Sequence, residues 1–245
     1  MPKHTILKMK DNSDSFTRDK GDLPDLPQRL VITMPSGGGK TNILANIMLR
    51  EQYNRKDYEP ENIFIFSGSL KGDHKIQTII KELDIPAGNV FTGYDENVME
   101  HIYKELTERY SEAIRDGVKP EHSLVVFDDV SYTNAFSKSS KQSMVDKLFC
   151  NSRKFLVSVI VIQQKYTQLN TCARENLSAL ILGKSTNKQI NLIEEDFNYL
   201  PSKKIFQDMI RRETPTKHSF IVFTPNKNDV YRDSNFKPLS ENKLI

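Results

Sequence analysis

The residues with the clearest capacity for chemistry form a glycine-rich loop that ends in a lysine and a threonine. They are Ser36, Gly37, Gly38, Gly39, Lys40 and Thr41. Glycines allow successive backbone N–H groups to turn toward the phosphates of a nucleotide. In such a loop the Lys40 ammonium would reach the β- and γ-phosphates, and the Thr41 hydroxyl would coordinate Mg²⁺. The spacing therefore predicts a site for a nucleoside triphosphate and magnesium.

The loop departs from the phosphate-binding pattern G-x-x-x-x-G-K-[ST] at one position, because Met34 stands where the first glycine is usual. That position lies at a strand end, away from Lys40 and Thr41, and we expect Gly37 and Gly38 to restore the flexibility. The alternative interpretation is a glycine-rich turn with a chance Gly-Lys-Thr. The apolar run before the loop and the helical spacing after it favour the phosphate-binding interpretation.

Two acidic residues, Asp128 and Asp129, directly follow the apolar run 124–127. A continuous apolar run is typical of a parallel strand that is buried on both faces, and ligands bind beyond the carboxyl ends of such strands. Asp128 would then hold magnesium, directly or through water. Asp129 could orient and deprotonate the attacking water.

A second strand, 155–162, ends at Gln163 and Gln164. A polar amide at this strand end faces the same crevice, where it could sense the γ-phosphate or position water. Arg153 precedes the strand and lies at its opposite end, so it could reach a neighbouring subunit's nucleotide if subunits form a ring. Arg174 follows the strand and is the other candidate for that role.

The segment 131–141 mixes lysines, hydroxyls and aromatic residues. Tyr132, Lys138 and Lys141 are its candidate DNA contacts, because such loops can track a nucleic-acid backbone. A solvated surface loop explains the composition equally well. The sequence leaves these two interpretations open.

The elements that must position these residues alternate between strands and helices, which predicts an α/β fold with a mainly parallel sheet. We expect strands at 30–34, 62–66, 89–92, 123–128, 155–162, 177–182 and 219–224, and helices at 42–50, 73–83, 98–114, 189–199 and 203–212. Polar residues 1–27 read as an N-terminal arm and 28–224 as the nucleotide-binding domain. Residues 225–245 read as an irregular C-terminal tail.

Composition bounds the remaining possibilities. The 245 residues carry a net charge of +3 with 37% hydrophobic residues, and no apolar run reaches the ~20 residues of a membrane span. We therefore expect no membrane partner and no signal peptide. The weak basic bias of residues 201–245 does not establish a polyanionic partner. The spacing of Cys150 and Cys172 indicates neither a disulfide framework nor a zinc site, which fits a reducing compartment.

Together these motifs resemble the FtsK–HerA superfamily of P-loop ATPases, and most closely the genome-packaging ATPases of large DNA viruses and of virophages of the Sputnik type. The resemblance rests on four segments, 35–41, 126–129, 158–164 and 174–176. Two departures from the family pattern are Met34 and the aspartate, in place of the commoner glutamate, at Asp129.

The resemblance implies a RecA-like sheet, ATP and Mg²⁺ as ligands, and a homo-oligomeric ring, either a pentamer or a hexamer. It also implies threading of double-stranded DNA into a capsid through a capsid or portal vertex, in a viral factory of the host cytoplasm. By position, Lys40 and Thr41 bind nucleotide and metal, Asp128 holds magnesium and Asp129 is the catalytic acid. Gln164 matches the polar sensor, and Arg153 best matches an arginine finger supplied by a neighbour.

Three alternatives remain open. A GTPase would use residues 226–229, which fit the N-x-x-D guanine pattern, but Asp128 begins no Asp-x-x-Gly switch. A capsid or scaffold protein would only bind nucleotide, which requires Asp129 and Gln164 to be incidental. Another DNA pump of the same superfamily, for segregation or transfer, shares the motor chemistry, since partners determine the cargo.

Overall fold

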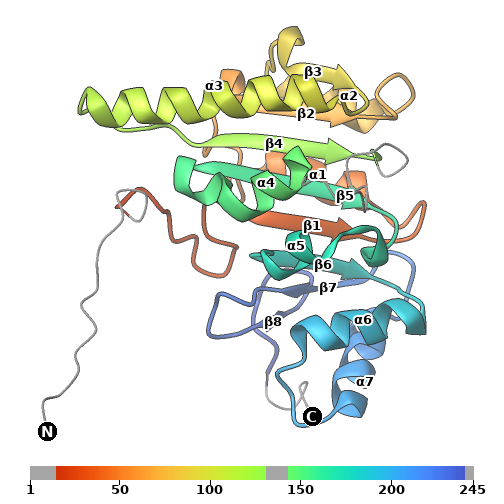
Figure 1. Cartoon of the computed structure of the whole chain (residues 1–245). Helices are drawn as coiled ribbons and strands as arrows, with labels where there is room; N and C mark the ends of the chain where they lie inside the picture. Colours follow the sequence, from red (N-terminus) through yellow and green to blue (C-terminus); the bar gives the residue numbers. More distant parts are fainter. Residues whose placement is uncertain (1–14, 131–142, 241–245) are drawn as a thin grey trace, which may run out of the picture.

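The computed structural model describes residues 15–130 and 143–240, and an eight-stranded sheet runs through this part of the chain (Figure 1). The strands are β1 (Arg29–Thr33), β2 (Ile63–Ser67), β3 (Val90–Thr92), β4 (Ser123–Asp128), β5 (Val157–Gln163), β6 (Ala179–Gly183), β7 (Phe220–Phe223) and β8 (Tyr231–Arg232). All seven strands expected from the sequence are present, each within a few residues of its predicted bounds. The short strand β8 lies in the segment that we expected to be irregular.

The order of strands in the sheet is β3-β2-β4-β5-β1-β6-β7-β8. The first six of these are parallel, and β7 and β8 are antiparallel to their neighbours. The predicted α/β fold with a mainly parallel sheet is therefore confirmed. Only β5 separates β1 from β4, so the glycine loop and the two acids leave the sheet at one edge, called here the carboxyl edge.

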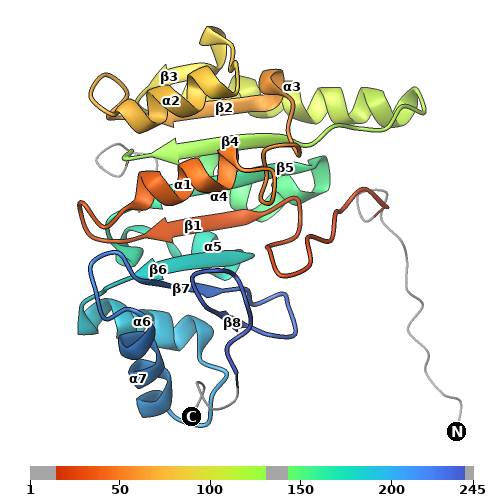
Figure 2. The ribbon, with the colours of Figure 1, turned by 180° about the vertical axis from the view of Figure 1, so that it is seen from behind.

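Helices cover both faces of the sheet (Figures 1 and 2). They are α1 (Lys40–Leu49), α2 (His74–Glu82), α3 (Glu96–Arg115), α4 (Met144–Asn151), α5 (Thr171–Glu175), α6 (Asn187–Phe197) and α7 (Lys203–Glu213), with 3₁₀ turns at Pro60–Asn62, Ala87–Asn89, Ser152–Phe155 and Tyr166–Gln168. Buried side chains of α1 and α2 pack on one face of the sheet, and those of α3 to α7 on the other. Successive side chains of each central strand point to opposite faces of the sheet and so contribute to both cores, which explains the continuous apolar runs of these strands.

Five helices, α2 to α5 and α7, begin at polar residues whose side chains accept from free backbone N–H groups. Asp73 accepts from the N–H groups of Lys75 and Ile76 at the start of α2, and Asp95 does the same for α3. Ser143 and Asp146 form a reciprocal pair of bonds at the start of α4. Such caps typically contribute about 1 kcal/mol each.

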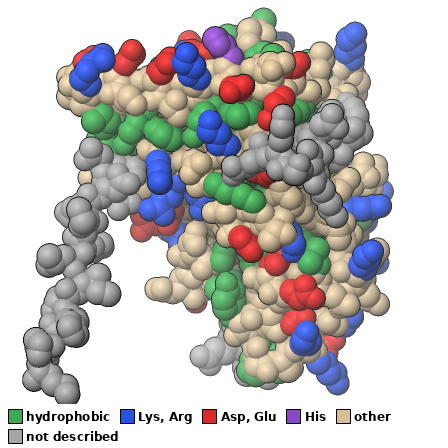
Figure 3. Space-filling view, in the orientation of Figure 1, with side chains coloured by type: hydrophobic (Ala, Val, Ile, Leu, Met, Phe, Trp, Pro, Cys, Tyr) green, Lys and Arg blue, Asp and Glu red, His purple; other side chains and the backbone are tan. Residues whose placement is uncertain are grey.

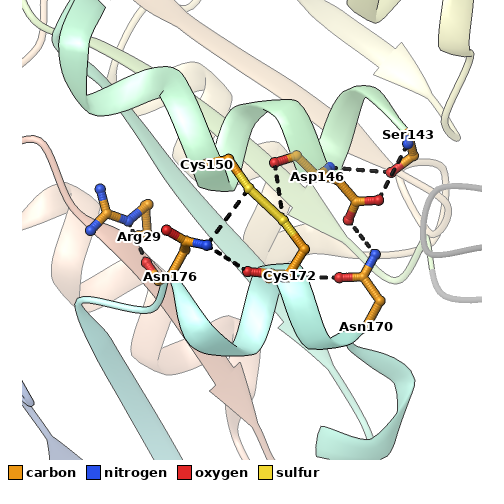
Figure 4. Close-up of a disulfide and its surroundings, with 8 residues drawn as sticks. Arg29, Ser143, Asp146, Cys150, Asn170, Cys172 and Asn176 are labelled. Atoms are coloured by element: carbon orange, nitrogen blue, oxygen red, sulfur yellow. Dashed lines mark hydrogen bonds between the residues drawn. A yellow bond between two sulfur atoms is a disulfide. The ribbon is translucent and has the colours of Figure 1, made fainter. Parts of the chain in front are cut away.

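Cys150 of α4 and Cys172 of α5 form a disulfide (Figure 4). The expectation that these cysteines have no disulfide role is therefore wrong. Their separation of 22 residues matches no local motif, and only the packing of α4 against α5 brings them together. Asn170 reinforces this contact, because its side chain donates to the Asp146 carboxylate and accepts from the backbone N–H of Ala173.

The segments expected to be an arm and a tail pack against each other at the opposite, amino edge of the sheet. Lys227 forms ion pairs with Asp19 and Asp25, and Arg232 forms one with Asp22. Residues 15–27 are thus fastened to the β7–β8 hairpin. The domain boundaries at residues 27 and 224 remain predictions.

Candidate nucleotide site

The glycine loop connects β1 to α1 at the carboxyl edge. Gly37 and Gly39 have positive φ angles of 67° and 104°, a region that residues with a Cβ rarely adopt. The Lys40 ammonium folds back over the loop and donates to the carbonyls of Met34 (2.9 Å) and Pro35 (3.1 Å). The loop therefore has the strand–loop–helix geometry that the sequence predicts for a phosphate cradle, with its lysine inside the curve.

Met34 occupies the position of the usual first glycine because Gly183 makes room for it. The Met34 side chain is fully buried, and a Cβ built on Gly183 would lie 2.5 Å from its Cε and 2.8 Å from its Cγ. Gly183 ends β6, the strand next to β1. The departure at residue 34 is thus compensated by a glycine far away in the sequence, in the neighbouring strand.

Asp128 ends β4 and is buried at the carboxyl edge. Its carboxylate accepts hydrogen bonds from the hydroxyls of Ser67 (2.9 Å) and Ser69 (3.1 Å). Burial raises the pKa of Asp128, and the bonds from the two serines offset part of that rise. A group that is costly to ionise here would gain from a nearby cation, as expected of a metal ligand.

A second acid, Asp73, lies beside Thr41 and was missed in the sequence. Its Oδ2 accepts from the Thr41 hydroxyl at 3.3 Å, and its charge contributes to the raised pKa of Asp128. Because the Thr41 hydroxyl donates its proton to Asp73, the lone pairs of its oxygen stay available to a metal ion. Thr41, Asp73 and Asp128 thus offer the hard oxygen ligands that Mg²⁺ prefers in combination with phosphates. The only sequence signal for Asp73 was its position before α2, which a helix cap explains as well.

Asp129 follows in the left-handed region, with φ 49°, which turns the chain sharply after β4. Burial lowers the pKa of the Lys40 ammonium, and the nearby carboxylates of Asp129 and Asp128 partly offset that effect. The two acids and the loop lysine therefore lie within electrostatic reach of one another. Left-handed backbone is tolerated by Asp better than by most residues with a side chain.

The two glutamines at the end of β5 differ in their surroundings. Gln163 pairs with Thr33 of β1 and is buried, and neither polar atom of its side-chain amide has a hydrogen-bond partner in the described part of the chain. Gln164, the residue predicted as the sensor, is exposed at the same edge. Gln163 ends β5, the strand that separates the glycine loop from the acids, and Gln164 follows it.

One further segment, between α7 and β7, lies against the glycine loop and was not anticipated from the sequence. The Nδ1 of His218 lies 3.2 Å from the carbonyl oxygen of Gly38, and a Cβ built on Gly37 would lie 2.8 Å from the Lys217 ammonium. Because a carbonyl oxygen can only accept, His218 must carry its proton on Nδ1 to bond there. The segment therefore packs closely against the phosphate loop.

Comparison with known proteins fits this geometry. The family model of the poxvirus A32 protein matches residues 14–225. The chain belongs to the poxvirus A32 protein family. This confirms the predicted resemblance to packaging-type P-loop ATPases, whereas the virophage type remains a prediction. Among curated proteins, none matches the sequence.

Solved structures share the fold of this A32 family member at low sequence identity. The genome packaging NTPase B204 from Sulfolobus turreted icosahedral virus 2, in complex with AMP, superposes with a TM-score of 0.59 at 11% identity, over 87% of this chain and 98% of B204. EssC (ATPases 2 and 3) from Geobacillus thermodenitrificans gives 0.57 at 13% identity, over 84% of this chain and 38% of EssC. The pCW3 conjugation coupling protein TcpA gives 0.53 at 13% identity, over 82% and 58%. These matches establish the P-loop ATPase fold.

The two candidate arginines of the A32 family member lie in different environments. Arg153 is exposed in the 3₁₀ turn before β5, at the amino edge. Burial of Arg29 lowers the pKa of its guanidinium, and the charge of Arg153 lowers it further. Arg174 of α5 is largely buried and forms an ion pair with Asp196 of α6 at 2.9 Å. The third set of candidates, Tyr132, Lys138 and Lys141, lies outside the described residues.

The guanine-type motif at residues 226–229 does not reach the glycine loop. It forms the turn between β7 and β8, and Lys227 is paired with Asp19 and Asp25 at the amino edge. A base-recognition motif must face the nucleotide, whose phosphate loop lies at the carboxyl edge. The geometry therefore argues against the GTPase alternative.

Two properties of the surface bear on partners. Within residues 15–130 and 143–240, no helix combines the length and apolar character needed to cross a bilayer. On the face shown in Figure 3, Lys and Arg side chains are interspersed with Asp and Glu. Among the described residues, this face carries no uniform basic surface.

Proposed function

We propose that this chain is a Mg²⁺-dependent ATPase that drives double-stranded DNA into a viral capsid. The observation that carries the proposal is the meeting of Lys40, Thr41, Asp128 and Asp129 at one edge of the sheet. Membership in the A32 family and the fold shared with B204, a genome packaging NTPase, support the same activity.

The chain's own residues divide the work at this site. Backbone N–H groups of the loop bind the phosphates, and Lys40 exchanges its bonds to Met34 and Pro35 for the β- and γ-phosphates. Thr41 and Asp128 hold the metal, and Asp73 orients the Thr41 hydroxyl. The metal, when bound, neutralises charge that develops on the transferring phosphoryl group.

Asp129 is the proposed base that takes a proton from the attacking water, and Gln164 positions that water. Aspartate is one bond shorter than the commoner glutamate. The left-handed backbone at Asp129 changes the direction in which its carboxylate leaves the strand. We infer that this turn compensates for the shorter side chain.

Arg153 is the proposed finger for a neighbouring subunit in a pentameric or hexameric ring. A strand of seven residues spans about 23 Å, and β5 separates Arg153 from the carboxyl edge of its own subunit. Arg174 is largely buried, which makes it the weaker candidate. The ring would act at a capsid or portal vertex within the viral factory.

The test is ATP hydrolysis by three proteins with and without double-stranded DNA. We expect wild-type protein to hydrolyse ATP only with Mg²⁺ and faster with DNA. Lys40→Ala should lose nucleotide binding, whereas Asp129→Asn should bind ATP and hydrolyse it at least about tenfold more slowly, because an amide cannot accept the proton. Equal loss of binding in both variants would contradict these roles, and no hydrolysis by wild type would favour a nucleotide-binding scaffold.

A second candidate is another DNA pump, since the fold of the conjugation coupling protein TcpA is also shared. The two candidates differ in the partner. Association of the wild-type protein with procapsids during infection supports packaging, and its absence from them supports a pump for transfer or segregation.

A further inference from the structure

A pocket of about 300 Å³ adjoins the glycine loop on the α1 side of the sheet. Gly38 and Gly39 line it, so the pocket is continuous with the phosphate cradle. None of the residues assigned above to phosphate, metal or water faces it except these two glycines. It has the size of a small-molecule subsite.

One part of the pocket wall is apolar and aromatic. It is formed by Ile43 and Ile47 of α1, Tyr53, Phe220 and Phe236. The rings of Tyr53 and Phe236 pack with centroids 5.7 Å apart, and Phe236 and Ile47 are buried. Such walls suit a flat, aromatic ligand, which gains from contact with both faces.

Polar side chains of the pocket can orient a bound ligand. The pocket is also lined by Asn42, Asn46, His218 and Ser234. The amide nitrogen of Asn46 donates to the Asn42 carbonyl at 2.7 Å, which fixes the orientation of this amide because a carbonyl only accepts. The Asn46 Oδ1 is thereby presented as an acceptor, and in the described part of the chain it has no hydrogen-bond donor.

The position of the pocket matches the reach of a nucleotide. Asn46 lies six residues after Lys40 on α1, or about 9 Å along the helix axis. A ribose and base extend a similar distance from the phosphates. A nucleotide whose phosphates lie on the N–H groups of the loop can therefore place its base between α1 and the segments around His218 and Phe236.

We propose that this pocket binds the adenine base of the nucleotide, with Asn46 Oδ1 accepting from the exocyclic amino group. Guanine carries a carbonyl oxygen at that position, so two acceptors would face each other. The pocket is then a specificity site for adenine. This inference rests on the proposed nucleotide-dependent function and adds a base site to it.

The experiment measures binding of ATP, GTP and inorganic tripolyphosphate by calorimetry. Tripolyphosphate presents the phosphates without a base. Asn46→Trp fills the pocket, and Arg50→Trp adds the same side chain at an exposed residue of α1's C-terminal end, outside the pocket. Asn46→Leu keeps the branched shape of the side chain and removes the Oδ1 acceptor, together with the amide donor that bonds the Asn42 carbonyl.

We expect Asn46→Trp to weaken ATP binding about tenfold or more and leave tripolyphosphate binding unchanged, since base stacking is lost. Asn46→Leu should lower the preference for ATP over GTP about three- to tenfold, the range of one hydrogen bond. Arg50→Trp should bind all three ligands as wild type does.

Wild-type affinity for ATP in both Asn46 variants would overturn the base site. An unchanged ATP-to-GTP ratio in Asn46→Leu would overturn the role of Asn46. If wild-type protein binds tripolyphosphate as tightly as ATP, the base contributes nothing and the inference fails while the phosphate site stands. If it binds neither ligand, the proposed function fails, and the base site fails with it.

Discussion

Gly183→Ala is expected to destabilise the protein through a single side chain, Met34. The added Cβ would lie 2.5 Å from Met34 Cε, 2.8 Å from its Cγ and 3.2 Å from its Cβ. All these atoms are buried, so the methionine cannot move into solvent. The φ of Gly183 lies outside the left-handed region, so alanine is excluded by this contact and not by the backbone.

The magnitude follows from the packing of this pair. Overpacking of a core by one methyl group costs about 1–3 kcal/mol. Met34→Ala alone removes a buried side chain and should cost about 2–5 kcal/mol. In the double variant the new methyl group occupies space that Met34 has left. The two losses should therefore fall short of additivity by about 1–3 kcal/mol.

Urea unfolding of wild type, both single variants and the double variant measures this coupling. Gly88→Ala is the matched control, because a Cβ there meets no atom within 4 Å, and its change should stay within about 0.5 kcal/mol. Additive losses, or a stable Gly183→Ala protein, would show that Gly183 does not accommodate Met34.

Three other predictions can be checked separately. Arg153→Ala protein should bind ATP normally but hydrolyse it roughly 10³-fold more slowly. Mixing it with Lys40→Ala protein should restore some hydrolysis. Normal hydrolysis by Arg153→Ala together with loss of hydrolysis in Arg174→Ala would make Arg174 the finger. Burial lowers the pKa of His122 to about 4, so the contribution of the neutral imidazole to stability is complete above pH 6.5 and is lost as the pH falls toward 4, by up to about 3 kcal/mol. His122→Asn should flatten the dependence of the unfolding free energy on pH in that window. An unchanged dependence would contradict the lowered pKa. Neutralising Lys138 and Lys141 together should flatten the salt dependence of DNA binding and uncouple DNA-stimulated hydrolysis, whereas unchanged stimulation would remove this segment from the mechanism.

The parts of the site that lie at strand ends were predictable from sequence. Apolar runs identify the buried strands, and parallel strands place Lys40, Asp128 and Gln164 at one edge without further information. The local pattern around residue 34 also showed that a glycine was missing. It could not show the compensating glycine at residue 183, because that contact depends on β6 lying next to β1.

Other features needed the three-dimensional structure for the same reason. Asp73 reads as an ordinary helix cap until its second oxygen is seen beside Thr41. His218 gives no sequence signal, since it follows a helix far along the chain. The disulfide between Cys150 and Cys172 also depends on the packing of two helices. Conversely, the guanine-type motif at 226–229 was a plausible local pattern that the sheet places at the wrong edge.

Movement along double-stranded DNA is the central claim, and displacement of a third DNA strand tests it most directly. The protein is incubated with a duplex that carries a labelled triplex-forming oligonucleotide, and release of the label is followed over time. The account predicts release by wild-type protein with ATP and Mg²⁺, and none by Lys40→Ala or Asp129→Asn. Active ATP hydrolysis by wild type without any release of the oligonucleotide would contradict it.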